Sequence, residues 1–355
     1  MHFGKLGLSF TAAVMACLSL IGCGGSGSSG SSTGLYMFIG NRSEPSISRF
    51  AIAGNGTFSR RGGDKETDGN VGGLASTPDG QYLYTSNFSN SINMFRVTSG
   101  GGLESLSPAT VELPDANYGI AITPDGKYLY ATSEQGKIFQ YVIGLDGTLT
   151  PNSTVSIDAG AYPVSVAISP NGQFAYVANN EGSTISCYTI NGNGTLSANG
   201  APVAAALGPW SLTFDAAGTH LYAGCASDDK VSQYTVNGNG TLTPLAPASV
   251  TGPTQCYAVA TSTAFNLVFS ASYNTPNLLQ GYTVGGGGTL TAGTPLETTH
   301  SSQWPIAFSP LNVLYVCNQD DNNVSAYVTD ASGNLTLIDK GNTGDEPASI
   351  TFVQK

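Results

Sequence analysis

Aromatic side chains recur in this 355-residue chain at a spacing that could build a ligand platform. Seven positions about 46 residues apart each open a short apolar segment, and four of them are aromatic: Gly72, Tyr118, Val164, Trp210, Tyr257, Trp304 and Ala348. Both tryptophans of the chain belong to this set. Aromatic rings offer a large apolar face at low entropy cost and so suit sugars and flat ligands. The alternative is that the same rings only wedge neighbouring structural units together.

Carboxylates recur in a second register, in the loops that follow the aromatic positions. The acidic residues of these loops are Glu134, Glu181, Asp228, Asp229, Asp320 and Asp321. Glu134, Glu181 and Asp228 are 47 residues apart, and Asp320 follows Asp228 after 92. Clustered oxygens could hold Ca²⁺ or favour a cationic ligand, whereas the alternative is a set of solvated turn residues. We predict Asp228 and Asp320 as ligand contacts and expect no cofactor apart from this Ca²⁺ alternative.

Few side chains in this sequence could act as a general base. His300 lies in the loop before Trp304 and is the only histidine expected beside the aromatic set. Glu134 and Glu181 are the carboxylate alternatives. The sequence contains no Gly-x-Ser-x-Gly elbow, phosphate-binding loop or His-Glu-x-x-His motif. We therefore predict His300, Glu134 and Glu181 as the candidates to activate a water molecule.

A repeat of about 46 residues must position these groups. Its clearest marker is an aromatic residue within a strand-forming segment, at steps of 48, 46, 46, 46, 47 and 46: Tyr36, Tyr84, Tyr130, Tyr176, Tyr222, Phe269 and Tyr315. Pro-Asp-Gly or Pro-Asn-Gly turns precede several markers, and Gly-x-Gly-Thr-Leu turns follow, as at 192–196. These turns divide each repeat into four short strands. The sequence therefore predicts one supersecondary unit copied seven times.

Seven four-stranded units of this length predict an all-β fold, a seven-bladed β-propeller over residues 35–355. The first unit begins at its second strand, residues 35–39, and lacks an inner strand. Residues 348–353 form a suitable strand at the other end of the chain. We predict that this C-terminal strand completes blade one and removes the free edge at the seam.

The N-terminus has the pattern of an export signal. Lys5 precedes an uncharged apolar run that ends in Leu20-Ile21-Gly22-Cys23. This ending resembles the bacterial lipobox, in which the cysteine is lipidated, and a membrane-spanning anchor is the alternative. We predict a lipoprotein signal peptide at 1–22, a lipidated Cys23 and a Gly/Ser tether over 23–34. The expected location is the cell envelope, periplasmic or outward-facing, with membrane contact only through the lipid.

Charge and cysteine content restrict the partners. The net charge of −11 argues against nucleic acid. All five arginines lie in the first two blades, so few groups elsewhere could clamp a phosphate. Four cysteines remain after Cys23, with no zinc-site spacing: Cys187, Cys225, Cys256 and Cys317. A disulfide between Cys225 and Cys256 and isolated buried thiols are both compatible with the pattern.

The segments Tyr176-Val177-Ala178-Asn179 and Tyr315-Val316-Cys317-Asn318, with the Asp/Asn-Gly and Gly-Asn-Gly-Thr-Leu turns, resemble the YVTN repeat and the lactonase family of seven-bladed propellers. That family includes 6-phosphogluconolactonase, and the resemblance covers residues 34–355. It implies hydrolysis of a sugar-derived lactone. We expect the protein to be a monomer. The phosphogluconolactonase-like members tend to carry His and Arg at the starts of inner strands, and none of the seven aligned positions here is basic. The alternative function is a non-catalytic, surface-tethered propeller that binds a glycan, a peptide or a partner protein.

Overall fold

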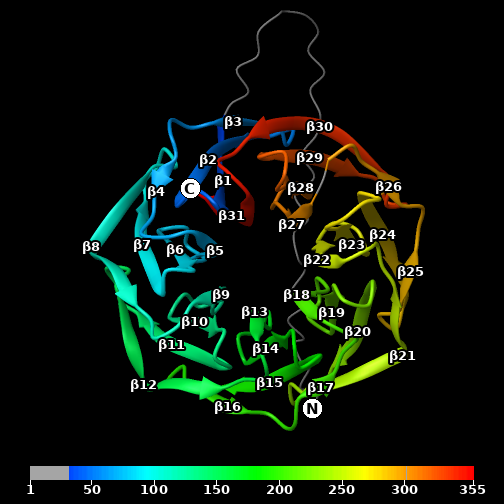
Figure 1. Ribbon diagram of the computed structural model, residues 1–355, viewed down its shortest axis with the longest axis horizontal. Coiled ribbons are helices and arrows are strands. Elements are labelled where there is room, and N and C mark those ends of the chain that lie inside the picture. Colours follow the sequence, from blue (N-terminus) through cyan, green and yellow to red (C-terminus); the bar gives the residue numbers. More distant parts are fainter. Residues whose placement is uncertain (1–31, 301) are drawn as a thin grey trace, which may run out of the picture. The chain divides into compact units, whose positions relative to one another are not determined.

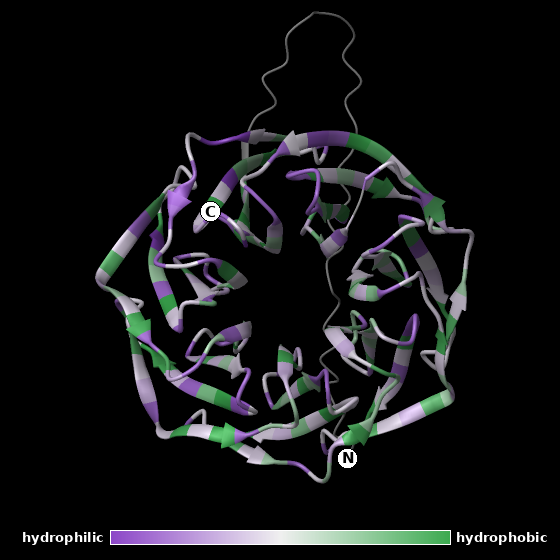
Figure 2. Ribbon diagram, in the orientation of Figure 1, coloured by the Kyte–Doolittle hydropathy of each residue, from purple (hydrophilic) through white to green (hydrophobic). Residues whose placement is uncertain are grey.

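The computed structural model describes residues 32–300 and 302–355. They form seven antiparallel sheets arranged as blades around a central axis (Figure 1). The described residues contain strands and turns but no helix, and so no apolar helix of membrane-spanning length. Hydrophobic segments recur on the strands of every blade (Figure 2). The predicted all-β, seven-bladed architecture is confirmed.

The blades follow the chain order from an inner to an outer strand. The inner strands, from blade two to blade seven and then blade one, are β5 (Val71–Ser76), β9 (Asn117–Ile122), β13 (Pro163–Ile168), β18 (Pro209–Phe214), β22 (Cys256–Ser262), β27 (Gln303–Phe308) and β31 (Pro347–Gln354). The second strands, from blade one to blade seven, are β1 (Ser32–Asn41), β6 (Tyr82–Asn87), β10 (Tyr128–Ser133), β14 (Phe174–Asn179), β19 (His220–Cys225), β23 (Leu267–Ser272) and β28 (Val313–Asn318).

The outer half of each blade is built in the same order. The third strands are β2 (Ser46–Ala53), β7 (Ser91–Val97), β11 (Lys137–Ile143), β15 (Thr184–Ile190), β20 (Lys230–Val236), β24 (Leu278–Val284) and β29 (Asn323–Thr329). The unbroken outer strands are β8 (Leu103–Glu112), β12 (Leu149–Asp158), β21 (Leu242–Thr251) and β30 (Leu335–Asn342). In blades one, four and six the outer strand is interrupted and forms the pairs β3 (Phe58–Arg60) and β4 (Lys65–Glu66), β16 (Leu196–Ala198) and β17 (Val203–Ala204), and β25 (Leu290–Ala292) and β26 (Leu296–Glu297).

The seam of the ring closes as the sequence predicts. β31 pairs antiparallel with β1, from Leu35 opposite Gln354 to Gly40 opposite Ser349. Blade one therefore combines the last strand of the chain with β1 to β4 from its beginning, and the blue and red ends meet in Figure 1. β1 begins at Ser32, three residues before the predicted boundary of the propeller. The predicted signal peptide and Cys23 lie outside the described residues.

The marker aromatics join each blade to the next. The hydroxyl of Tyr84 donates to the carbonyl of Gly147 at 2.7 Å, and Tyr176 donates to Gly240 at 2.8 Å. Tyr130, Tyr222 and Tyr315 make the equivalent bond to a turn glycine of the following blade. Each of these hydroxyls is buried, so the bond satisfies a group that would otherwise be costly to bury.

The predicted marker aromatic of blade one, Tyr36, is wrong by two residues. β1 and β6 both end at an asparagine, Asn41 and Asn87. Counting back from these residues places Phe38, not Tyr36, at the position of Tyr84. The first step is therefore 46 residues rather than 48. Phe38 is fully buried but has no hydroxyl, so blade one makes its inter-blade contact there without this hydrogen bond.

The four described cysteines are free, buried thiols. Cys225 packs in a cluster with Tyr176 and Cys187, towards blade four. Cys256 packs in a different cluster with Tyr222, between blades five and six. Burial raises the pKa of Cys187 to about 11 and that of Cys256 to about 12. The structure thus favours isolated thiols over the disulfide alternative.

Candidate ligand site at the mouth of the central channel

One end of the central channel encloses a cavity of about 270 Å³. Its walls are the second to fourth residues of the inner strands, and six of the seven aligned positions take part: Gly72, Tyr118, Val164, Trp210, Trp304 and Ala348. None of the described residues that line it carries a charge. The cavity therefore suits an uncharged ring of modest size. We refer to this end of the channel, where the chain enters each inner strand, as the mouth.

Trp210 is the centre of an aromatic cluster across the mouth. Its ring lies 4.9 Å from Tyr257 and 6.0 Å from both Tyr118 and Trp304, measured between ring centroids. The interplanar angles of 62° to 81° are edge-to-face, the arrangement that the ring quadrupoles favour. Tyr257 also packs on Tyr273 and does not line the cavity. The four predicted aromatics thus both pack together and, except for Tyr257, face the cavity.

A second ring of residues surrounds the aromatic cluster. In every blade the residue after the second strand donates its main-chain N–H to the residue just before the inner strand, at 2.9 to 3.2 Å. The donors are Arg42, Phe88, Glu134, Asn180, Ala226, Tyr273 and Gln319. We call these seven residues the rim. Steps of 46 or 47 residues from Glu134 reach every member, so the repeat contained the signal that would have found Arg42 and Phe88.

Backbone strain is concentrated beside the rim. Four of the seven acceptor residues have a positive φ although they are not glycine, at 48° to 53°: Tyr162, Gln255, Ser302 and Glu346. A non-glycine residue in this conformation costs on the order of 1 to 2 kcal/mol. Strain repeated at one place persists only where the surrounding structure fixes it, and such places are often functional.

Glu134 and two tyrosines form the polar part of the mouth. The hydroxyls of Tyr118 and Tyr162 are 2.7 Å apart. Burial, the contact with Tyr162 and the nearby Glu134 carboxylate raise the pKa of Tyr118 above its ordinary value. The Tyr118 hydroxyl therefore stays protonated at neutral pH and can donate a hydrogen bond. Glu134 is half-buried beside it, where its carboxylate can accept a proton from a bound water.

His300 lies away from this group. Its Nδ1 is 2.8 Å from Oδ2 of Asp321, and its side chain is buried in the loop before blade seven. This pairing orients the ring, and no spacing in the sequence predicts it. His300 is not among the residues that line the cavity. Glu134 is not among them either, but it lies beside Tyr118, which does line the cavity, whereas the side-chain partner of His300 is Asp321.

The predicted carboxylate positions do not share one register. The rim position of blade four is Asn180, so Glu181, one residue further on, is exposed in the hairpin turn. Asp228 forms an ion pair with Lys230 at 2.8 Å. Asp320 accepts a hydrogen bond from the Ser302 hydroxyl at 2.7 Å. Among the described residues, no three His, Cys, Asp or Glu side chains gather to hold a metal ion.

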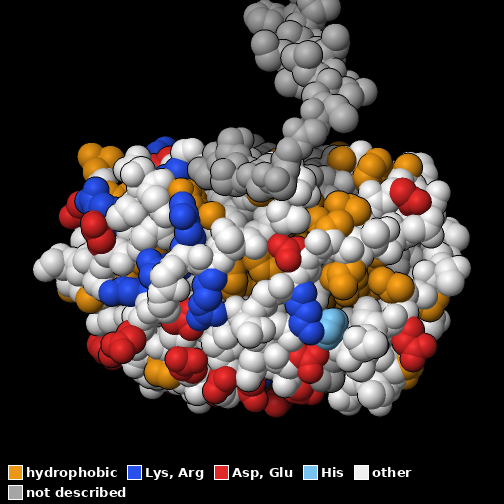
Figure 3. All heavy atoms as spheres, turned by 90° about the horizontal axis from the view of Figure 1, so that it is seen from above, with side chains coloured by type: hydrophobic (Ala, Val, Ile, Leu, Met, Phe, Trp, Pro, Cys, Tyr) orange, Lys and Arg blue, Asp and Glu red, His pale blue; other side chains and the backbone are white. Residues whose placement is uncertain are grey.

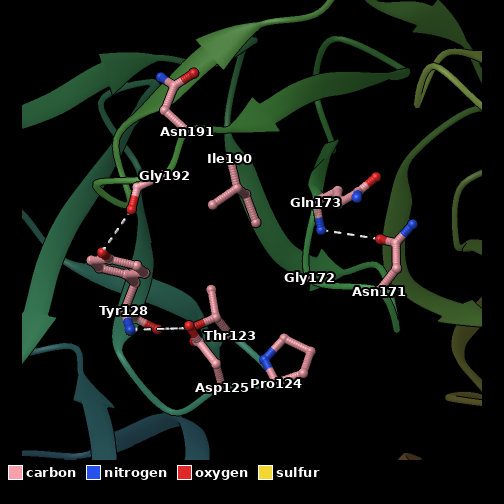
Figure 4. Close-up of a pocket in the computed structure, with 10 residues that line it drawn as sticks. All are labelled: Thr123, Pro124, Asp125, Tyr128, Asn171, Gly172, Gln173, Ile190, Asn191 and Gly192. Carbon is pink, nitrogen blue, oxygen red and sulfur yellow. Dashed lines mark hydrogen bonds between the residues drawn. The ribbon is translucent and has the colours of Figure 1, made fainter.

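Another cavity lies between blades three and four at the opposite end of the blades. It has a volume of about 450 Å³ and is bounded by Tyr128, Ile190 and Gln173 (Figure 4). Its carboxylate, Asp125, is engaged in its own turn by Thr123 and the Lys127 N–H. A similar groove lies one blade earlier. Because these grooves follow from the repeated turn geometry, we place the candidate site at the mouth.

Charge is uneven around the ring. The arginines lie in blades one and two, and several Lys and Arg side chains gather on the edge of the propeller that is uppermost in Figure 1 (Figure 3). Blades three to seven contain four lysines and most of the acidic residues. A guanidinium at the mouth can therefore come only from the side of blades one and two.

Comparisons with known proteins agree with this fold. Residues 83–209, from β6 to the start of blade five, match the family model described as lactonase, 7-bladed beta-propeller. No curated protein matches the sequence.

Solved structures match over nearly the whole propeller. A protein of Bacteroides fragilis, provisionally named a 6-phosphogluconolactonase, superposes with a TM-score of 0.79 at 22% identity, covering 90% of this chain and 98% of the other. The periplasmic gluconolactonase of Pseudomonas aeruginosa gives a TM-score of 0.75 at 21% identity, covering 90% and 99%. At these identities the likeness establishes the fold. The comparisons thus confirm that this chain resembles the seven-bladed β-propellers of the lactonase family.

Proposed function

We propose that this protein hydrolyses a small, sugar-derived lactone at the mouth of the channel. The observation that carries the proposal is Glu134, a half-buried carboxylate beside the protonated Tyr118 hydroxyl, at the edge of an uncharged aromatic cavity. A base, a hydrogen-bond donor and a ring-sized cavity are what ester ring opening requires. The match to the lactonase family model supports the same reaction class. So do the names of the similar proteins from B. fragilis and P. aeruginosa, which are both called lactonases.

The proposed reaction adds one water across the ring ester. Glu134 takes a proton from the water, whose oxygen attacks the lactone carbonyl. The Tyr118 hydroxyl donates a hydrogen bond to the carbonyl oxygen as it gains negative charge. The ring C–O bond then breaks, the proton passes from Glu134 to the leaving alkoxide, and the product is the open hydroxy acid. Trp210 and Trp304 hold the sugar ring by apolar contact.

Replacing Glu134 by glutamine is expected to lower kcat at least about 100-fold, because positioned general bases typically contribute a factor of about 10² to 10⁴. KM should change little, since the amide keeps the shape of the carboxylate. Acid release from gluconolactone and 6-phosphogluconolactone, followed with a pH indicator against spontaneous hydrolysis, measures both constants. Glu181→Gln is the matched control, as Glu181 is exposed. Full activity of Glu134→Gln would assign the base elsewhere, with His300→Gln as the next variant.

A non-catalytic binding propeller is the second candidate. It is favoured by the cavity itself, whose described lining residues are uncharged and, apart from three serines, aromatic or aliphatic. In that case the wild-type protein should show no turnover above background for any lactone, while gluconolactone or a short neutral glycan still changes the tryptophan fluorescence. The same assays therefore separate the two functions.

We also propose that the protein is exported and acts as a monomer tethered to the envelope through a lipid on Cys23. The apolar run and the Leu20-Ile21-Gly22-Cys23 ending support this, and the P. aeruginosa neighbour is named as periplasmic. Replacing Cys23 by serine is expected to move the protein from the membrane fraction to the soluble fraction. Mass spectrometry of the mature N-terminus should find a diacylated cysteine in the wild type. An unprocessed Met1 would contradict the proposal.

A further inference from the structure

We propose that the ligand of the channel carries one carboxylate group and that Arg42 binds it. This defines the substrate class of the mouth, a lactone with a carboxylate substituent on its ring skeleton. As a statement about the reaction it rests on the proposed lactonase function, whereas the binding site itself does not. The proposal is based on Arg42, a cation of the rim. Arg42 is not one of the seven aligned inner-strand positions, none of which is basic.

Arg42 lies against the aromatic cluster of the mouth. It is the first residue after β1, and its main-chain N–H donates to the carbonyl of Glu346 at 2.9 Å, as rim residues do. Its guanidinium carbon lies 5.2 Å from the centre of the Phe88 ring. The Phe88 ring in turn lies 4.7 Å from that of Tyr118, which lines the cavity. Arg42 thus lies on the rim, next to Phe88, and Phe88 contacts a ring of the cavity wall.

The charge of Arg42 also acts across the mouth. Burial raises the pKa of Tyr257, and the charge of Arg42 opposes this shift. Tyr257 belongs to blade six, so the guanidinium in blade one is close enough to interact with the far side of the aromatic cluster.

Arg42 has no counter-ion among the described residues. Other cations do: Arg60 pairs with Asp64 at 2.6 Å and Lys230 with Asp228 at 2.8 Å. Arg42 is half-buried, and no described side chain forms an ion pair or hydrogen bond with its guanidinium. The face of Phe88 provides a cation–π contact. The N–H groups on the edge of the guanidinium remain available for an anion.

The chemistry of the mouth favours a carboxylate over a phosphate. A guanidinium binds one carboxylate with two parallel hydrogen bonds. The cavity beside it is uncharged and accepts the neutral part of the ligand. Glu134, on the same rim, would repel an anion more strongly the more charge it carries. A monoanion next to a single arginine is therefore better matched than a phosphate dianion.

Three lactones with one carbon skeleton test the proposal. Gluconolactone has a neutral hydroxymethyl group at carbon 6, glucarolactone a carboxylate and 6-phosphogluconolactone a phosphate. Because both tryptophans of the chain lie in the mouth, their fluorescence reports binding independently of turnover. Fresh solutions of each lactone are titrated into the wild type, Arg42→Gln and Arg42→Lys. Arg61→Gln is the matched control, since Arg61 is an exposed arginine of the same blade.

We expect the wild type to bind glucarolactone at least 10-fold more tightly than gluconolactone. Arg42→Gln should remove this preference and leave gluconolactone binding within two-fold, Arg42→Lys should restore part of it, and Arg61→Gln should have no effect. Tightest binding of the phosphate compound, equal losses for all three lactones, or no fluorescence response to any of them would overturn the proposal. Arg42-dependent binding of glucarolactone without turnover would leave the subsite standing and refute the lactonase function.

Discussion

Replacing Gly240 by alanine is expected to lower the free energy of unfolding by about 2 to 5 kcal/mol. Gly240 has a φ of 81°, and an added Cβ would lie 2.2 Å from Cδ1 of Phe174 in the preceding blade. The backbone term is about 1 to 2 kcal/mol, and forced overpacking costs about 1 to 3 kcal/mol. Both act together because the ring of Phe174 cannot move out of a packed inter-blade interface.

The same turn contains its own control. Gly238 is two residues away, has no positive φ, and an added Cβ there would meet nothing within 4 Å. Gly238→Ala should therefore leave stability within about 0.5 kcal/mol of the wild type. Chemical denaturation followed by fluorescence measures both variants. Equal midpoints for the two variants would show that the inter-blade contact at Gly240 is not rigid.

The contact at Gly240 also shows what the repeat encodes. The Gly-Asn-Gly-Thr-Leu segments are hairpin turns, as the sequence predicts. Their second glycine is needed for a further reason, because an aromatic ring of the previous blade lies where its Cβ would be. Gly194 meets Tyr128 and Gly288 meets His220 in the same way. Its carbonyl then accepts the marker tyrosine hydroxyl. The repeat shows in the sequence only as regular spacing. It does not show which residues touch, because the tyrosine lies about 64 residues before the glycine that it contacts.

The architecture could be predicted because every repeat contributes to it. Seven copies of one strand and turn pattern outweigh any single irregularity, and the missing inner strand of blade one has only one place to come from. Single positions are less secure. Tyr36 lies two residues from the true marker, Phe38, and Glu181 one residue from the rim. Each blade differs slightly in the length of its turns, so counting in fixed steps can miss the equivalent residue by one or two positions.

The mouth could be predicted only in part. Tyr118, Trp210 and Trp304 were found because they follow the repeat and are large. Arg42 was not predicted because it lies at the rim, after a second strand. The family resemblance places basic residues at the starts of inner strands instead. The His300–Asp321 pair depends on how two loops of blade seven fold together, and neither loop is constrained by the repeat. Function in this chain lies in the positions where the repeats differ.

Removing residues 347–355 is expected to abolish the folded state. These residues supply β31, which pairs with β1 from Leu35 to Asn41 and completes the core around Phe38. Without it, β1 would become an unpaired edge inside the channel, and Val353, which is buried, would be missing from that core. Near-ultraviolet circular dichroism and thermal unfolding should show loss of fixed tertiary packing. Removal of Lys355 alone is the control, because it spares the strand.

The same strand links the stability of the ring to the site. Ala348, Ser349 and Ile350 of β31 line the cavity, and the turn before β31 carries Glu346, whose carbonyl fixes the main chain of Arg42. A synthetic peptide of residues 347–355 added to the truncated protein should therefore restore the near-ultraviolet signal and the Arg42-dependent binding together. Recovery of the fold without binding would place the anion subsite outside the closed mouth. Native packing in the truncated protein without the peptide would show that six complete blades suffice, because blade one would then be dispensable for closure.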